Sequence, residues 1–425
     1  MVKHISLRSL ALLAAASFAF AGCTTADVPS KGPAIAPDAG GAGATAVPGR
    51  APSWRDRPAA DGRGAYAVAG LGDTHFDAAP ATVYHAAYDT SAPNGAHVVT
   101  EQSRSAEMWR ERMPSLLAAS AKVALQDANP PTRVVLQRGD IINGDCNDDD
   151  AHRRMLRDAL AATRAPYAAA TGAGEPTPPL PFLTVLGNHD FRGSPNGRKI
   201  YFEWAESLLS RELGEDVAYP LFSFRIDDDR WIFCDFEKVS LFDVAEEIES
   251  DPSARYVFLV THGPFTASQS GNNWIWRLSG WKSKGGTGQG VPELFEAISR
   301  RRAIVLSGHT HRPAFYRNEN QFGGYTEFTA NSVWSSGNLA SVDPIPGHDT
   351  PSAFGTWHSK NVKEENRAAY DADIARFKAG LKEYYLGKGA GHFRLEVSDE
   401  RVLMRFYPGD ATEPGRTFDL TPGRP

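Results

Sequence analysis

The feature of this sequence that most constrains its fold is a repeated arrangement, in which a short apolar run is followed at once by Gly, Asp, Asn or His. Such runs occupy residues 65–71, 133–137, 181–186, 255–261 and 303–307. Each run has the length of a buried strand. Segments with helical spacing separate several of them, at residues 105–127, 149–162, 197–213 and 292–301. Strands that alternate with helices predict an α/β fold, with functional residues at the carboxyl ends of the strands.

Other runs predict a second sheet. Residues 221–226 and 230–236, joined by three Asp residues, are typical of an antiparallel hairpin. Further strands are predicted at 325–329, 392–397 and 402–407. We therefore expect an α/β sandwich of two mixed sheets flanked by helices, in a folded domain that spans residues 65–425.

The first 22 residues have the layout of a signal peptide. Lys3 and Arg8 precede an apolar stretch that ends in small residues before Cys23. The ending Phe-Ala-Gly-Cys at 20–23 resembles a bacterial lipobox, although Phe stands where Leu is usual. We expect an exported protein of the cell envelope, held to a membrane by a lipid anchor at Cys23. The alternatives are secretion to the periplasm after cleavage near Ala21, or an uncleaved anchor.

Composition restricts the remaining possibilities. Residues 23–64 are rich in Ala, Gly, Pro and Ser, which predicts a disordered tether. The net charge is −6 with no concentrated Lys/Arg run, so no binding to duplex nucleic acid is expected. Beyond Cys23 the chain has only Cys146 and Cys234, which form either a disulfide in an oxidising compartment or two separate thiols.

The residues just past the five predicted strands are suited to metal binding. Glycines beside them let the backbone turn tightly and bring side chains together. A mixture of carboxylate, amide and imidazole groups favours transition metals over calcium. Seven candidates exceed the need of one four-coordinate ion, whereas two ions ~3.5–4 Å apart, bridged by one carboxylate, use them all. The candidate ligands are Asp73, His75, Asp140, Asn188, His262, His309 and His311.

The charges of such a site predict an anionic substrate. Two divalent ions outweigh Asp73, Asp140 and a bridging hydroxide, so a positive pocket remains in an acidic protein. Metal ions depress the pKa of bound water, and both can hold oxygens of a phosphoryl group during in-line attack. The sequence therefore indicates hydrolysis of a phosphoester.

The ordered motifs resemble those of the calcineurin-like metallophosphoesterase superfamily over residues 65–311. They are Asp-x-His at 73–75, Gly-Asp at 139–140, Gly-Asn-His-Asp at 187–190, His262 and Gly-His-x-His at 308–311. The resemblance implies that Asp73, His75 and His311 hold one ion, that Asn188, His262 and His309 hold the other, and that Asp140 bridges them. Purple acid phosphatases, which share these motifs, have Tyr at the place of Asn143, so a tyrosinate-bound ferric ion is not expected. Mn, Zn and ferrous iron remain open.

The resemblance also implies roles for two further residues. His189 faces the substrate, stabilises the phosphoryl oxygens and protonates the leaving alkoxide, while Asp190 orients its imidazole. Nearby, Arg192 is interpreted as a surface residue, with contact to a phosphate oxygen as the alternative. Asp145 is interpreted as the acceptor of an Asx turn, with a hydrogen bond to a residue behind the ligands as the alternative. A rim loop at about 266–290, with Trp274, Trp276 and Trp281, is expected over the pocket.

We expect an exported dinuclear phosphoesterase that cleaves a monoester or diester by attack of metal-bound hydroxide. The substrate is a phosphorylated small molecule, a nucleotide or a lipid. A two-domain 5′-nucleotidase is disfavoured because only 114 residues follow His311. The alternative is a non-catalytic envelope-binding lipoprotein that keeps the metal for stability.

Overall fold

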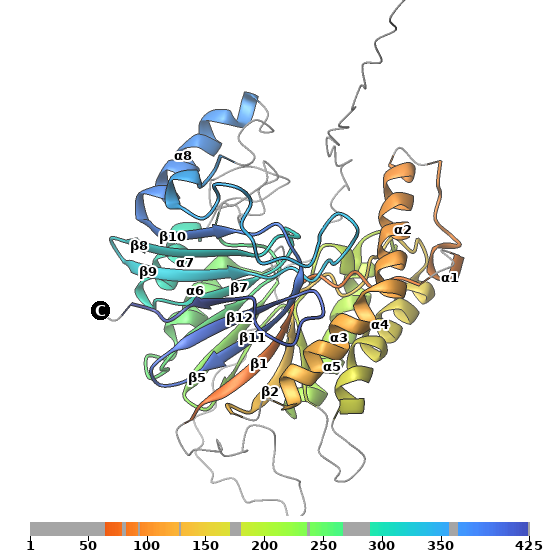
Figure 1. Cartoon of the computed structure of the whole chain (residues 1–425), viewed down its shortest axis with the longest axis horizontal. Coiled ribbons are helices and arrows are strands. Elements are labelled where there is room, and N and C mark those ends of the chain that lie inside the picture. Colours follow the sequence, from red (N-terminus) through yellow and green to blue (C-terminus); the bar gives the residue numbers. More distant parts are fainter. Residues whose placement is uncertain are drawn as a thin grey trace, which may run out of the picture. The chain divides into compact units, whose positions relative to one another are not determined.

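Two sheets pack face to face in this protein (Figure 1). The computed structural model describes residues 64–78, 82–91, 94–126, 129–170, 180–235, 239–266, 290–356 and 364–423. All of these residues belong to one compact unit. The predicted signal peptide, the predicted tether apart from Gly64, and nearly all of the predicted rim loop with its three tryptophans lie outside the described residues.

The first sheet has six strands in the order β13-β12-β11-β1-β2-β3. Its strands β1, β2 and β3 are parallel, and β11 joins the edge of β1 in antiparallel register, followed by β12 and β13. The bounds are β1 (Tyr66–Leu71), β2 (Thr132–Gln137), β3 (Phe182–Thr184), β11 (Gly391–Val397), β12 (Val402–Pro408) and β13 (Arg416–Asp419).

The second sheet has seven strands in the order β10-β8-β9-β7-β6-β5-β4. Strands β5, β6, β7 and β9 run parallel at its centre, and the remaining strands pair antiparallel. The bounds are β4 (Leu221–Ile226), β5 (Asp229–Cys234), β6 (Val257–Val260), β7 (Ile304–Ser307), β8 (Ala314–Asn320), β9 (Gly323–Thr329) and β10 (Leu381–Leu386).

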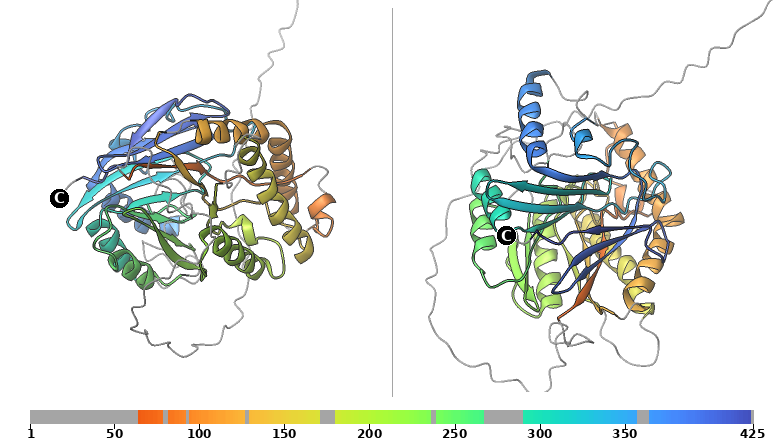
Figure 2. Two further views of the ribbon diagram at one scale, coloured as in Figure 1. Left: turned by 90° about the horizontal axis from the view of Figure 1, so that it is seen from below. Right: turned by 60° about the vertical axis from the view of Figure 1, so that its left-hand side comes forward.

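Helices cover the outer faces of both sheets (Figure 2). The helical layer on the first sheet contains α1 (Thr82–His85), α2 (Gly95–Glu111), α3 (Met113–Gln126), α4 (Asp149–Ala170) and α5 (Gly197–Leu213). The second sheet is covered by α6 (Leu241–Glu249) and α7 (Val291–Arg300), and α8 (Glu364–Gly380) lies against β8. The predicted two-sheet α/β sandwich is confirmed.

The alternation of side chains along the central strands explains the layers. On β6, Phe258 and Val260 join the buried cluster that also contains the residues of β1 and β2. Val257 and Leu259 point the other way and pack with residues of α6 and α7, such as Ile248. Because successive side chains of a strand face opposite sides, a strand that is apolar on both faces requires cover on both.

The helix predicted over 105–127 is wrong in its bounds. The structure has two helices, α2 and α3, and α2 already begins at Gly95. Arg112 separates them with φ −129°. Pro114 follows in the first turn of α3. Proline has no N–H to donate and its ring clashes with the carbonyl four residues back, so one continuous helix cannot pass this point.

Two open questions about the chain receive partial answers. Cys146 and Cys234 are both buried free thiols, so the disulfide alternative is wrong. No helix within the described ranges is long and apolar enough to cross a bilayer.

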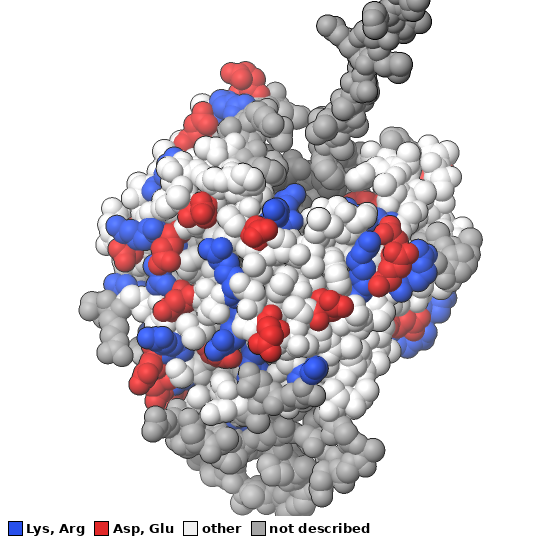
Figure 3. Space-filling model, viewed as in Figure 1, with Lys and Arg blue, Asp and Glu red and all other residues white. Residues whose placement is uncertain are grey.

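On the face shown in Figure 3, basic and acidic side chains of the described residues are interspersed. This face therefore carries no broad electrostatic field of one sign.

Candidate metal centre

The seven predicted ligands come together from both sheets. Asp73 and His75 follow β1, Asp140 follows β2, and Asn188 follows β3. From the second sheet, His262 follows β6, and His309 and His311 follow β7. All of these strands are parallel within their sheets, so their carboxyl ends deliver polar loops to one edge.

One group of side chains consists of Asp73, His75 and His311. His75 Nε2 lies 2.8 Å from His311 Nε2. His311 Nε2 lies 3.9 Å from Asp73 Oδ2. The two imidazole rings meet edge to face with their centroids 4.7 Å apart. His311 Nε2 therefore lies near a nitrogen of His75 and a carboxylate oxygen of Asp73.

A second group consists of Asn188, His262 and His309. Asn188 Oδ1 lies 2.8 Å from His309 Nδ1 and 3.2 Å from His262 Nε2. The two histidine nitrogens are themselves 3.2 Å apart. His262 Nδ1 donates to the backbone carbonyl of Arg138 at 2.7 Å, which leaves Nε2 as the nitrogen with a lone pair.

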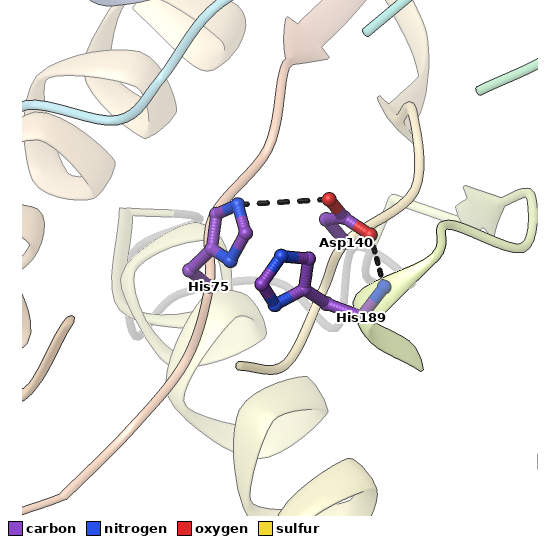
Figure 4. A group of neighbouring side chains, drawn as sticks. All are labelled: His75, Asp140 and His189. Carbon is purple, nitrogen blue, oxygen red and sulfur yellow. Dashed lines mark hydrogen bonds and ion pairs between the residues drawn. The ribbon is translucent and has the colours of Figure 1, made fainter. Parts of the chain in front are cut away.

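Asp140 lies between the two groups. Its Oδ2 atom is 3.6 Å from His75 Nε2 and 3.3 Å from His262 Nε2. Its Oδ1 atom accepts the backbone N–H of His189 at 2.7 Å. Figure 4 shows one carboxylate oxygen of Asp140 facing the His75 ring and the other facing the backbone nitrogen of His189. One carboxylate thus has an oxygen fixed by the backbone and an oxygen turned toward both histidine groups.

The residues fit a pair of cations. Asp73 Oδ2 and Asp140 Oδ2 are buried and accept no hydrogen bond from any described residue. Buried carboxylate oxygens without donors require another positive partner. Ligand atoms bonded to one ion at about 2.0–2.2 Å lie roughly 3–3.5 Å apart. The separations given above run from 2.8 to 3.9 Å, so they suit ligands around shared ions.

The pKa values of most of these imidazoles also suit metal binding. Burial lowers the pKa of His75 and of His309, and burial with the charge of Arg104 lowers the pKa of His311 to about 3. These rings are therefore neutral at physiological pH, as ligation requires. His262 differs, because the charges of Asp140 and Asp73 overcome burial and raise its pKa to about 9. A cation placed among these carboxylates would displace that proton.

Glycines make the close approach possible. A Cβ on Gly139 would lie 2.4 Å from His262 Nδ1, and Gly139 has φ +85°. A Cβ on Gly187 would lie 2.2 Å from Asp140 Oδ1. Any larger residue at either place would displace a candidate ligand. The glycines beside the predicted ligands therefore have the steric function that the sequence indicated.

His189 is near the centre, but its imidazole is not oriented as predicted. Its Nδ1 lies 2.8 Å from the backbone carbonyl of Asn143, so Nδ1 carries the proton and donates it. The carboxylate of Asp190 instead accepts the backbone N–H groups of Asp140, Ile142 and Gly187 at 2.9, 3.2 and 2.8 Å. The predicted role of Asp190 in orienting the ring is therefore wrong, and the Asn143 carbonyl takes that place.

Arg192, for which the sequence offered contact with a phosphate oxygen but favoured a surface position, lies beside His189. Its Nη1 atom lies 3.2 Å from His189 Nε2. Nε donates to Asp145 Oδ2 at 2.7 Å, and Nη2 donates to Glu101 Oε2 at 2.7 Å. The interpretation as a surface residue is wrong, since its side chain is only 23% exposed. Asp145 likewise anchors a guanidinium, and Glu101 comes from α2.

Burial and the nearby guanidinium determine the protonation of His189. Burial lowers the pKa of His189, and the positive charge of Arg192 lowers it further. The guanidinium has only donors, so His189 Nε2 acts as the acceptor in their contact. The neutral ring with its proton on Nδ1 is therefore the form that this environment stabilises.

The loop that carries His262 is fixed from behind by a buried carboxylate. Glu327 on β9 accepts the backbone N–H groups of Phe265 and Thr266 at 2.7 and 2.6 Å. It also accepts the Ser307 hydroxyl at 3.0 Å. One side chain of the second sheet thus joins the loop after β6 to the end of β7.

Within the described residues, two sets have ligand atoms close enough to hold a metal ion: His75 with Asp140 and His189, and Asp140 with His262 and His309. The family model for calcineurin-like phosphoesterases matches residues 66–313, which is more than half of the chain. No curated protein matches the chain significantly.

Several solved structures resemble this one. The anchor protein of the Plasmodium inner membrane complex is 13% identical, with a TM-score of 0.44 and coverage of 85% of this chain and 90% of that one. A purple acid phosphatase from yellow lupin (Lupinus luteus) seeds is 12% identical, with a TM-score of 0.46 and coverage of 84% and 53%. A dimetal phosphatase from Danio rerio is 12% identical, with a TM-score of 0.40 and coverage of 84% and 99%. From the match of its sequence to the family model, the chain belongs to the calcineurin-like phosphoesterase family and is a hydrolase that acts on phosphoester bonds.

Proposed function

We propose that this protein is an exported phosphoesterase that uses two divalent transition-metal ions, Mn, Zn or Fe. Asp73, His75 and His311 would hold one ion, while Asn188, His262 and His309 would hold the other. Asp140 would contact both through Oδ2. The observation that supports this most strongly is the pair of buried carboxylate oxygens, Asp73 Oδ2 and Asp140 Oδ2, that lack hydrogen bonds among the described residues.

The two ions, when bound, supply a lowered pKa for water and positive charge against the phosphoryl oxygens. The protein itself holds the loops that carry the candidate ligands in position. Asp190 fixes the loops of Asp140 and Asn188 through three backbone N–H groups. Its contribution is positional, because it contacts the backbone rather than the reacting groups.

His189 and Arg192 would contact the substrate. His189 Nδ1 is occupied by the Asn143 carbonyl, so a phosphoryl or leaving oxygen would meet Nε2, in exchange for its contact with Arg192. Arg192 Nη1 lies beside that nitrogen and offers N–H groups to an oxyanion. As a general acid, His189 would first take a proton from solvent water at Nε2 and then donate that proton to the leaving alkoxide.

The test of this proposal is hydrolysis of p-nitrophenyl phosphate with Mn, Zn or Fe added separately. We expect activity that depends on metal and disappears in Asp140→Ala. His189→Asn should keep its metal content while turnover falls by ~10² to 10⁴. The control is Arg110→Gln on α2, which changes a side chain that is 61% exposed. If metal-loaded protein releases no product from monoesters, diesters, nucleotides or phospholipid headgroups, the non-catalytic alternative replaces this proposal.

Export and lipid attachment at Cys23 form a separate part of the proposal. Support comes from the sequence of residues 1–23, which resembles a signal peptide with a lipobox. In cells fed labelled palmitate, we expect incorporation that is lost in Cys23→Ser. Absence of label in the wild-type protein, with the protein present outside the cytoplasm, would indicate plain secretion instead.

A further inference from the structure

The guanidinium group of Arg192 is held by carboxylates from two different parts of the chain. Asp145 Oδ2 accepts from Nε at 2.7 Å and lies 2.5 Å from Nη2. Glu101 Oε2 accepts from Nη2 at 2.7 Å. The third nitrogen, Nη1, lies 3.2 Å from His189 Nε2. Two of the three guanidinium nitrogens are therefore bound to carboxylates, and Nη1 is the nitrogen that faces the imidazole.

Asp145 is tied to Arg192 through the backbone as well. The Asp145 N–H donates to the Arg192 carbonyl at 2.8 Å. A Cβ on the next residue, Gly193, would lie 2.4 Å from the Asp145 Cα atom. A substitution of Asp145 would therefore disturb a close contact between two loops of the candidate centre, and its effect on Arg192 could not be separated from that disturbance.

Glu101 belongs to helix α2, which packs on the loops of the candidate centre from outside. Trp109 Nε1 donates to the carbonyl of Thr74, the residue between Asp73 and His75, at 2.8 Å. The Ser105 hydroxyl donates to Asn143 Oδ1 at 3.1 Å. Residues four positions apart lie on the same side of a helix, so positions 101, 105 and 109 face these loops together. The helix thus holds the Glu101 carboxylate at a fixed place beside the centre.

The charges of this group do not favour an anion. The guanidinium contributes one positive charge and its two carboxylate partners contribute two negative charges. The contribution of Arg192 to substrate binding is therefore the direction of its N–H groups. Because a guanidinium is planar, contacts that fix Nε and Nη2 also fix the direction of the two hydrogens on Nη1, of which His189 Nε2 accepts at most one.

We infer that Glu101 is a positioning residue, which holds Arg192 so that an N–H of Nη1 meets a phosphoryl oxygen of the substrate beside His189. This inference rests on the proposed function and adds to it a residue from outside the metal-binding motifs. Without Glu101, the guanidinium keeps Asp145 along one edge but loses the acceptor on its other side. Its donors must then be ordered when the substrate binds, and that ordering weakens binding.

Binding of inorganic phosphate distinguishes this role from an effect of charge, because the two predict opposite signs. Removal of a carboxylate near an anion site strengthens phosphate binding by charge alone. Loss of the Arg192 orientation weakens it. By isothermal titration calorimetry on the metal-loaded protein, we expect Glu101→Ala to weaken phosphate binding by about 3- to 10-fold with metal content unchanged. Glu101→Gln should recover most of the loss, since its amide oxygen accepts the same hydrogen bond.

A double-mutant cycle shows whether Glu101 acts through Arg192. In wild-type background, we expect Glu101→Ala to lower kcat/KM for p-nitrophenyl phosphate by about 5- to 30-fold. In Arg192→Ala background, the same change should lower it by less than about 2-fold, because the group that Glu101 positions is absent. The control is Glu107→Ala, since Glu107 on the same helix also pairs with an arginine, Arg112, at 2.9 Å, but its side chain is 34% exposed.

Unchanged or tighter phosphate binding in Glu101→Ala would overturn the inference, as would equal losses of kcat/KM in both backgrounds or a wild-type protein that binds no phosphate. If the wild-type protein binds phosphate but hydrolyses no phosphoester, the proposed function fails, while the titration still decides the role of Glu101. If Glu101→Ala does not fold, Glu101→Asp decides. It keeps the charge on a shorter side chain, so weaker phosphate binding supports positioning and unchanged binding contradicts it.

Discussion

Four of the candidate ligands have left-handed backbone conformations. His75, Asp140, His309 and His311 have φ values of 44°, 52°, 72° and 51°. For residues other than glycine this conformation costs roughly 1–2 kcal/mol each. Strain of this kind concentrates at functional sites, where the surrounding structure imposes it. These backbone conformations therefore lower the stability of the loops, but they place the imidazole and carboxylate groups next to one another.

A pair of substitutions at His311 isolates this strain. Both His311→Ala and His311→Gly remove the imidazole, but glycine adopts φ 51° without the cost of a Cβ. In metal-free protein we expect His311→Gly to be more stable than His311→Ala by about 1 kcal/mol, measured by denaturant unfolding. At Arg110 in α2 the order should reverse, because glycine destabilises a helix by about 0.5–1 kcal/mol relative to alanine. Equal stability of the two His311 variants would mean that the backbone there is unstrained.

Asp190 provides a second test at the residue scale. Asp190→Ala leaves three buried backbone N–H groups without an acceptor, and each unsatisfied group costs about 1–3 kcal/mol. We expect a loss of roughly 3 kcal/mol or more in the free energy of unfolding. Asp149→Ala, near the surface, should cost much less, although Asp149 also accepts two hydrogen bonds from Asn196. Loss of turnover in Asp190→Ala without loss of stability would restore the catalytic role predicted from the sequence.

At the scale of elements, helix α2 contacts the candidate site through Glu101, whose carboxylate accepts a hydrogen bond from Arg192. Burial opposes the charge of its carboxylate, but His189 and Arg192 overcome that effect and lower its pKa from 4.5 to about 2. A carboxylate with a lowered pKa stabilises the fold above its unfolded pKa. That contribution is lost as the pH falls from 4.5 toward 2.

The corresponding prediction concerns the pH dependence of unfolding. At pH 7 we expect Glu101→Gln to be less stable than wild type, and the two curves should converge as the pH falls to about 2, where the wild-type carboxylate becomes protonated. Glu107→Gln is the control on the same helix, with the Glu107 side chain 34% exposed beside Arg112. A difference that stays constant with pH would contradict the assigned charge pair.

The elements differ in how far the sequence predicts them. The strands that deliver the candidate ligands are buried on both faces, so their apolar runs mark them clearly. Strand β8 is missed because its residues 317–320 are polar, and α8 because it lacks an apolar face of helical period. The ligand candidates follow predicted strands directly and are therefore found. The contact of Arg192 with Glu101 joins positions 91 residues apart, and no local pattern encodes it.

At the scale of the whole molecule, the candidate centre joins the two sheets. Four of the seven residues follow strands of the first sheet and three follow strands of the second. Ions bound there would link the sheets, and a ligand that binds only the folded state raises stability by mass action. The free energy of unfolding of the sandwich should therefore rise when metal ions bind at the centre.

This coupling predicts a thermal shift. Adding Zn or Mn at about 100 times its dissociation constant should stabilise metal-free protein by about 2.7 kcal/mol for each site filled. Calorimetry or circular dichroism should show the rise in Tm for wild type and for the surface control Asp149→Asn. The rise in Tm should largely vanish in Asp140→Asn, because this change replaces the carboxylate that lies between the two groups of candidate ligands by a neutral amide. An undiminished shift in Asp140→Asn would place the ions elsewhere.

The buried carboxylate of Glu327 has a consequence for how this protein can diversify. It holds the backbone at Phe265 and Thr266, immediately before residue 267. Because these hydrogen bonds fix the backbone at 265–266, we expect changes of length or composition after residue 266 to leave the imidazole of His262 in place. A foreign segment grafted between Thr266 and Gly290 should therefore leave metal content unchanged, and a changed substrate preference in that variant would support the rim loop predicted from the sequence.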